Sequence, residues 1–216
     1  MWVIRCTLFS VKFTINTLCA HMTACDSTHV TAAQHILKYL KYVRDQGLTF
    51  RKPVKLDRLS MQIFSDANFG GASSTSAFLI IVESIGSIMF MSKQQTTVSK
   101  STMESEFRSA SHAAQVCEGY VNLFGQLGLL VNTPATLFVD NTATIAATQT
   151  QATSFKLRHL LIDHAYLREL CFRSLISPSH VDGTHNPADL GTKHLNADAT
   201  ARYSRIILDS AGGHEL

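Results

Sequence analysis

The sequence predicts an α/β sandwich whose strands and helices follow the order βββαβαβα. Three observations support this prediction. Three short stretches of strand character precede a long amphipathic helix, a fourth strand follows that helix, and helical and strand patterns then alternate. A strict βαβ repeat would not begin with three consecutive strands. The 216 residues are 45% hydrophobic, which is enough to bury the core of such a sandwich.

The first three strands are expected at 61–66, 77–83 and 87–91. Turn-forming residues separate them, so they are read as an antiparallel meander. The long helix is expected over 102–127, because apolar residues recur there in steps of four and three. This periodicity is the most regular in the sequence.

The remaining elements are a strand at 135–139, a helix at 158–170 and a strand at 175–181. The fourth strand ends in Asp140 and Asn141, whose side chains suit the cap of a following helix. Asn186 and Pro187 are read as the N-cap and first position of a terminal helix. We therefore expect five strands in one sheet.

The first 57 residues have a different pattern. Apolar residues spaced by three and four predict a helix that Thr28 caps and Gly47 ends. A basic stretch containing a proline, residues 51–58, follows and is the expected boundary. The apolar stripe of this helix should dock on the rest of the chain, self-associate, or belong to a partly disordered segment.

Composition excludes several classes of protein. The 19 Lys and Arg against 16 Asp and Glu give a net charge of +3, too small a bias to indicate a nucleic-acid partner. No apolar run approaches a membrane span and no clear targeting peptide is present, so a cytosolic or nuclear location is expected. The five cysteines are scattered without a CxxC pair, which favours free thiols over disulfides or a zinc site.

Four acidic residues lie near strand ends and helix starts: Asp66, Glu106, Asp140 and Asp189. Such ends meet at one edge of an α/β sheet, where these folds build sites. Clustered carboxylates repel one another unless cations bind, and hard oxygen ligands favour Mg²⁺ or Mn²⁺. Two such ions about 4 Å apart support hydrolytic phosphoryl transfer.

A structural role is the alternative for each of these residues. Asp140 and Asp189 could serve only as helix caps or partners of a helix dipole. Ser101 and Glu104 have the spacing of a capping box, in which Glu104 reaches back to the helix start. That assignment leaves Glu106 as the acidic residue of the long helix that is available for the site.

Four sequence blocks resemble the ribonuclease H domain of copia-type retrotransposon Pol polyproteins, in the same order and spacing. The blocks are FSDANF at 64–69, SKQQTTVSKSTMESEF at 92–107, LFVDNTATI at 137–145 and HVDGTHNPADLGTKHL at 180–195. Residues 31–40 and 47–50 are similar to the tail of the preceding reverse transcriptase. The resemblance covers roughly residues 12–196.

The resemblance implies a three-layer fold with a mixed five-stranded sheet and an N-terminal helical appendage. It divides the chain into a reverse transcriptase remnant at 1–57, a ribonuclease H-like domain at 58–196 and a C-terminal helix or tail at 197–216. It also implies an RNA–DNA hybrid as substrate and two Mg²⁺ ions, replaceable by Mn²⁺. The implied metal ligands are Asp66, Glu106, Asp140 and Asp189.

Departures from the family pattern leave these four residues intact. Asn68 stands where the family usually has an acidic residue, and Phe90 replaces an expected tryptophan. Leu161 and Asp163 replace acidic and basic residues of the family. Gly191 is expected within the last helix, where glycine costs about 1 kcal/mol relative to alanine.

Further residues are candidates for contacts with the hybrid: Lys93, Gln94, Asn141 and Arg158. His185 lies four positions before Asp189 and could move a proton to the leaving oxygen, with His180 as the alternative. An ordinary surface histidine is the competing interpretation for both.

Three hypotheses follow for function. The first is a Mg²⁺-dependent endonuclease that cuts the RNA strand of a hybrid, with little sequence preference because contacts go to phosphates and 2′-hydroxyls. The second is an inactive or domesticated nucleic-acid-binding module, motivated by the absent polymerase portion and the initial Met1. Its partners would be the missing polymerase portion or a second copy. The third, an integrase or transposase core, lacks the expected His/Cys module.

Overall fold

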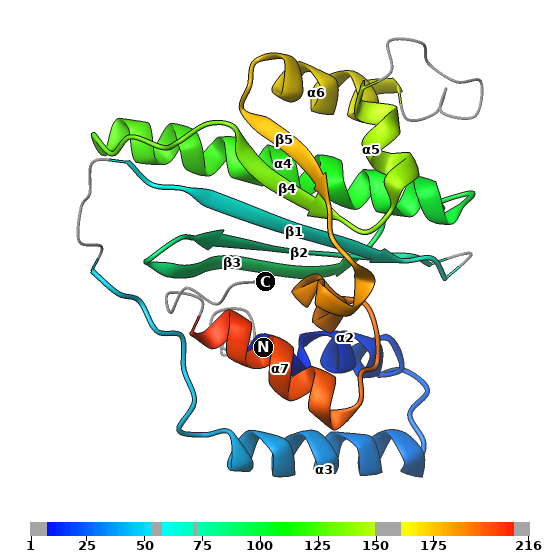
Figure 1. Ribbon diagram of the computed structural model, residues 1–216. Coiled ribbons are helices and arrows are strands. Elements are labelled where there is room, and N and C mark those ends of the chain that lie inside the picture. Colours follow the sequence, from blue (N-terminus) through cyan, green and yellow to red (C-terminus); the bar gives the residue numbers. More distant parts are fainter. Residues whose placement is uncertain (1–7, 53–57, 71–72, 150–160, 210–216) are drawn as a thin grey trace.

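A mixed five-stranded β-sheet lies in the middle of the molecule, and helices cover both of its faces (Figure 1). The computed structural model describes residues 8–52, 58–70, 73–149 and 161–209. The strands are β1 (Met61–Asn68), β2 (Thr75–Val82), β3 (Gly86–Gln94), β4 (Ala135–Val139) and β5 (Ile176–His180).

The strand order is β3-β2-β1-β4-β5. β1 pairs with β2 and β2 with β3 in antiparallel fashion, whereas β1 with β4 and β4 with β5 are parallel. The predicted meander and the mixed sheet are therefore confirmed. Because β1 and β4 are parallel neighbours in the centre, both deliver their C-terminal ends to the same edge of the sheet.

One helical layer consists of α4 (Thr102–Gln126), α5 (Thr142–Gln149) and α6 (Leu161–Phe172). α4 covers the central strands and buries Phe107, Ala110 and Cys117 against them. α6 adds Leu167 and Leu170 to the same core. The predicted helix at 158–170 corresponds to α6, and residues 158–160 lie outside the described part.

The opposite layer contains η1 (Phe9–Val11), α2 (Lys12–Ala20), η3 (Gly183–His185), η4 (Pro187–Gly191) and α7 (Ala197–Leu208). Its core gathers Phe64, Leu79, Phe90, Tyr203 and Ile207, all of them buried. The two cores on opposite faces make the molecule the three-layer sandwich that was expected.

Two helical elements that were not predicted, η1 and α2, pack on strand β3. The rings of Phe9 and Phe90 stack with their centroids 4.8 Å apart. Lys12 donates to the Phe90 carbonyl oxygen at 2.8 Å, and Asn16 donates to that of Ser92 at 3.0 Å. Docking, one of the three arrangements expected for the N-terminal segment, therefore applies to this part of it. Phe90, in place of the expected tryptophan, packs against this added layer.

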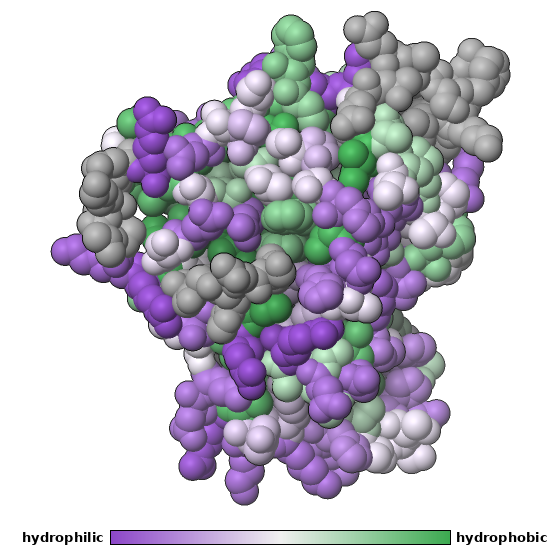
Figure 2. All heavy atoms as spheres, viewed as in Figure 1, coloured by the Kyte–Doolittle hydropathy of each residue, from purple (hydrophilic) through white to green (hydrophobic). Residues whose placement is uncertain are grey.

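Helix α3 (Ser27–Tyr42) differs from its prediction at both ends. It ends at Tyr42 with Val43 as its C-cap, and not at Gly47. Its N-cap is Asp26 and not Thr28, because the Asp26 side chain accepts hydrogen bonds from two backbone N–H groups of the first turn. Val30 and Leu37 of its apolar stripe are 52% and 66% exposed. Hydrophilic residues predominate around α3 on the face shown in Figure 2.

The terminal helix predicted from Asn186 and Pro187 is instead two separate elements. Asn186 does cap a helix, but this is the 3-10 helix η4, which ends at Gly191. A separate α-helix, α7, begins at Ala197, and Asn196 caps it.

The expected cost of Gly191 within an α-helix therefore does not apply. A Cβ at this position would lie 2.4 Å from the Cβ of Ala77 in β2 and 3.2 Å from atoms of Phe90 and Ser92. Glycine is needed here because η4 lies directly on the sheet. No helix in the described part of the chain is long and apolar enough to cross a membrane.

Candidate active site

Three carboxylates come together at the edge of the sheet where β1 and β4 end. Asp66 lies near the end of β1, Glu106 in the second turn of α4, and Asp140 directly after β4. Ligand oxygens of these three residues all lie within 4.8 Å of one another. Asp66 and Glu106 are buried, whereas Asp140 is partly exposed. Ser109 ties α4 to β1 by donating to the Asp66 carbonyl oxygen at 2.8 Å.

The capping pattern at the start of α4 decides which glutamate faces the site. The Ser101 hydroxyl accepts from the Glu104 N–H at 3.2 Å, and a Glu104 carboxylate oxygen accepts from the Lys100 N–H at 2.7 Å. Arg108 pairs with Glu104 at 3.0 Å. Glu104 thus serves the helix start, as its position in the capping box predicted, while Glu106 lies beside Asp66 and Asp140.

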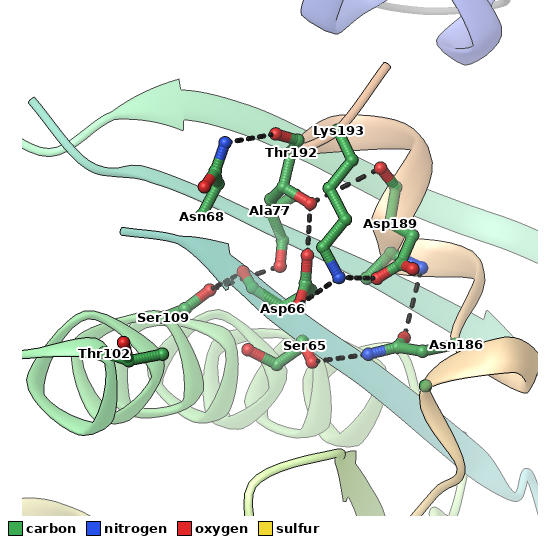
Figure 3. Close-up of polar contacts among 12 residues, drawn as sticks. Ser65, Asp66, Asn68, Ala77, Thr102, Ser109, Asn186, Asp189, Thr192 and Lys193 are labelled. Carbon is green, nitrogen blue, oxygen red and sulfur yellow. Dashed lines mark hydrogen bonds and ion pairs between the residues drawn. The ribbon is translucent and has the colours of Figure 1, made fainter. Parts of the chain in front are cut away.

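Asp189, the fourth acidic residue, approaches the other three through Asp66. It lies in η4 and is 7% exposed, but it is not among the three carboxylates in mutual proximity. Lys193 bridges the two sides, with its Nζ 2.9 Å from an oxygen of Asp189 and 3.5 Å from one of Asp66 (Figure 3).

Hydrogen bonds hold the segment that carries Asp189 against strand β1 (Figure 3). The Thr192 hydroxyl donates to the second oxygen of Asp66, and Asn68 donates to the Thr192 carbonyl oxygen at 3.2 Å. The buried amide of Asn186 donates to the Ser65 carbonyl oxygen at 2.9 Å. These contacts place the start of η4 at the same sheet edge as Asp66.

The proximity of the carboxylates changes their proton affinities. Burial, followed by the charges of Asp66 and Asp140, raises the pKa of Glu106 to about 9. Burial and then Asp66 raise the pKa of Asp140. In the absence of a bound cation, Glu106 therefore binds a proton more readily than an ordinary glutamate. The cluster of Asp66, Glu106 and Asp140 therefore favours binding of a positively charged group, either a proton or a cation.

Lys193 supplies part of that positive charge. Burial and Asp66 raise the pKa of Asp189 to about 7, although Lys193 opposes the shift. Burial lowers the pKa of Lys193, but the carboxylates of Asp66, Asp189 and Asp140 outweigh that effect, so its pKa lies above its ordinary value. Lys193 therefore remains an ammonium.

The donor set fits a divalent cation with a preference for oxygen ligands. Within the described residues, the Glu106 Oε2 atom is buried and has no hydrogen-bond partner. A buried carboxylate oxygen without a partner is costly, and a cation held jointly with Asp66 and Asp140 would satisfy it. The residues expected to bind metal are thus arranged in a way that can do so.

The candidate contacts with nucleic acid lie in different surroundings. Lys93 and Gln94, at the end of β3, line a groove of about 290 Å³ together with Arg108 and His112 of α4. Asn141 uses its side-chain oxygen to accept from two backbone N–H groups at the start of α5. Asn141 therefore caps the start of α5. Arg158 lies outside the described residues.

The two histidines also differ in position. His180 is the partner of Val139 in the pairing of β5 with β4, one residue from Asp140. His185 lies in η3, where its ring is 3.1 Å from the Thr184 hydroxyl and 3.9 Å from a carboxylate oxygen of Asp182. Of the two, His180 is the histidine that lies beside the strand that delivers Asp140.

Sequence reasoning missed Thr192 and Lys193. Both lie in the fourth motif block, and Lys193 follows Asp189 by four residues, a spacing at which opposite charges meet on a helical turn. That spacing was a usable signal for the contact with Asp189. The contact with Asp66 joins residues 127 positions apart, for which no local pattern exists.

The mixed five-stranded sheet with helical layers on both of its faces is a ribonuclease H-like α/β fold. Two relatives are retrovirus-related Pol polyproteins of the Arabidopsis thaliana transposons RE2 and RE1, each 24% identical over 201 residues. The match covers 91% of this chain but only 14% and 13% of the relatives. Both relatives are thus retrovirus-related Pol polyproteins, the kind of polyprotein that the motif blocks resemble.

Solved structures with a similar fold are ribonuclease H domains and a retroviral enzyme. LC11-RNase H1 in complex with an RNA/DNA hybrid has a TM-score of 0.48 at 14% identity, covering 62% of this chain and 94% of that one. The N-terminal RNase H domain of rv2228c from Mycobacterium tuberculosis has a TM-score of 0.44 at 14% sequence identity. The match covers 68% of this chain and 97% of that one. The prototype foamy virus protease-reverse transcriptase has a TM-score of 0.39 at 9% sequence identity. The match covers 78% of this chain and 23% of that one. No protein-family model matches the sequence.

Proposed function

We propose that this chain is a Mg²⁺-dependent endonuclease that hydrolyses the RNA strand of RNA–DNA hybrids, as part of a copia-type retrotransposon Pol polyprotein. The observation that carries the proposal is the gathering of Asp66, Glu106 and Asp140 within 4.8 Å, around a buried Glu106 oxygen without a partner among the described residues. The relationship to Pol polyproteins supports the retroelement context.

Asp66, Glu106, Asp140 and Asp189 are the residues that would hold the ions. When bound, the ions would activate a water and stabilise the oxygen that leaves the phosphorus. The chain itself keeps Asp66 in place through the Thr192 hydroxyl and orders β1 and α4 through Ser109. This rigidity matters because the reacting groups must be held in position before the reaction.

His180 is the histidine that we propose for proton transfer near the leaving group. It lies at the end of β5 beside the strand that delivers Asp140. The groove lined by Lys93 and Gln94 is proposed to contact a nucleic-acid strand, because Lys93 supplies positive charge and the glutamine offers hydrogen bonds.

The test is a cleavage assay with the purified chain and a hybrid labelled on the RNA strand. We expect Mg²⁺-dependent cuts on the RNA strand, inhibition by EDTA, and no cleavage of duplex DNA or duplex RNA of the same sequence. Several hybrids should be cut with little sequence preference. A folded sample that binds the hybrid without cleaving it in Mg²⁺ or Mn²⁺ would contradict the proposal and identify an inactive binding module.

A further inference from the structure

Lys193 holds an unusual position among the four acidic residues of the site. Its Nζ lies between an oxygen of Asp189, at 2.9 Å, and an oxygen of Asp66, at 3.5 Å (Figure 3). Asp66 is 1% exposed and Asp189 9% exposed at the side chain, whereas Lys193 is 40% exposed. The ammonium therefore reaches from solvent into a buried acidic centre.

This position divides the centre into two unequal sides. On one side, Asp66, Glu106 and Asp140 bring ligand oxygens together, whereas the side-chain contacts of Lys193 with the described residues go to Asp66 and Asp189. On the other side, the space between Asp66 and Asp189 contains the ammonium of Lys193. Asp66 is common to both sides.

We infer that Lys193 is a built-in cation that occupies the Asp66–Asp189 side of the centre until a divalent ion displaces it. This inference rests on the metal-dependent function proposed for the same site. It makes the two ion positions unequal. An ion can bind to Asp66, Glu106 and Asp140 with Lys193 in place, whereas a second ion beside Asp189 requires the ammonium to leave.

Charge and flexibility support this exchange. A divalent ion beside the ammonium would experience like-charge repulsion at a distance of a few ångströms, where such interactions are strong in a partly buried site. Lysine is suited to the role, because its charge is a compact ammonium on a flexible four-carbon stem. The exposure of its side chain gives it a route into solvent. Lys193 is thus a positioning residue that regulates occupancy by the second ion.

The test measures binding of Mn²⁺, used as the probe ion, to the full chain without nucleic acid. Calorimetry and electron paramagnetic resonance give the number of ions and both affinities. We expect the parent protein to bind one ion well and a second weakly. In Lys193→Met and Lys193→Gln, the second ion should bind about tenfold more tightly or better, a larger gain in affinity than that of the first ion.

Two variants serve as controls. Lys193→Arg keeps a positive charge at the position and should leave the second ion weak. Lys38→Met removes the same charge from the exposed surface of α3 and should match the parent in both affinities. Circular dichroism checks that each variant is folded. If one of the two neutral variants, Lys193→Met or Lys193→Gln, does not fold, the other still tests the inference.

Second-ion affinities that are equal to or weaker than those of the parent, in the folded neutral variants, would overturn the inference. A parent that binds no Mn²⁺ would overturn both this inference and the proposed metal centre. If the ions bind as expected but the hybrid is not cleaved, the proposed function fails while the role of Lys193 stands. The metal-binding readout therefore separates the two.

Discussion

Asp140 is the most accessible of the three carboxylates that come together, and burial and Asp66 both raise its pKa. Replacement by asparagine retains the size of the side chain but removes one negative charge. We expect Asp140→Asn to lower hybrid cleavage by several orders of magnitude. The metal-free protein should be at least as stable as the parent, because repulsion among the carboxylates is relieved. Cleavage rates and thermal unfolding without metal, measured side by side, check both effects.

Glu104→Gln is the matched control for this prediction. Glu104 lies two residues from Glu106 and is also buried, but its oxygens bind the start of α4 and Arg108. A glutamine keeps an oxygen for the cap, so cleavage should stay close to that of the parent. If Glu104→Gln abolished cleavage while Glu106→Gln preserved it, the roles of the two glutamates would be reversed.

At the scale of elements, the 3-10 helix η4 adds the fourth acidic residue to the site, because it brings Asp189 against the end of β1. Its close packing on β2 depends on Gly191, where a Cβ would lie 2.4 Å from the Cβ of Ala77. We predict that Gly191→Ala lowers the free energy of unfolding by about 1–3 kcal/mol, since overpacking forces the backbone to shift. Urea unfolding followed by circular dichroism measures this change.

Gly119→Ala is the corresponding control. Gly119 lies within α4, and a Cβ there would meet no atom within 4 Å. Alanine should therefore stabilise the protein by about 0.5–1 kcal/mol through its better helix propensity. Equal stability of Gly191→Ala and the parent would show that η4 does not approach β2 as closely as described.

At the scale of the whole molecule, the N-terminal segment is packed as part of the second core. Phe9 is 5% exposed and stacks on Phe90 of β3. We predict that Phe9→Ala lowers the free energy of unfolding by about 3 kcal/mol, through lost burial and the cavity that remains. Chemical denaturation of the full chain provides the measurement.

Phe172 offers a matched comparison, because its side chain is 88% exposed at the end of α6. Phe172→Ala should change the free energy of unfolding by less than about 0.5 kcal/mol. A Phe9→Ala variant as stable as Phe172→Ala would mean that the contact with Phe90 contributes nothing to folding, and that the segment is an addition to an independent domain.

The sequence alone determined the features that depend on local patterns. Short stretches of strand-forming residues bounded by turn residues located all five strands, and the steps of four and three located α4. The spacing of Ser101 and Glu104 distinguished the capping glutamate from Glu106, since both partners of a capping box lie within one turn. The motif blocks named the residues of the acidic edge, three of which the fold brings together.

The tertiary structure decided what depends on contacts between distant segments. Helix α2 was not recognised, because the partners of Lys12 and Asn16 belong to β3, more than 70 positions away. Asn186 was correctly predicted to cap a helix. The helix is the short η4, which ends at Gly191, where the chain lies against Ala77 of β2. Lys193 meets Asp66 across 127 positions, and only the folded chain places its ammonium in the acidic centre. Short-range patterns report on neighbours in sequence, whereas the arrangement of charges in the site depends on neighbours in space.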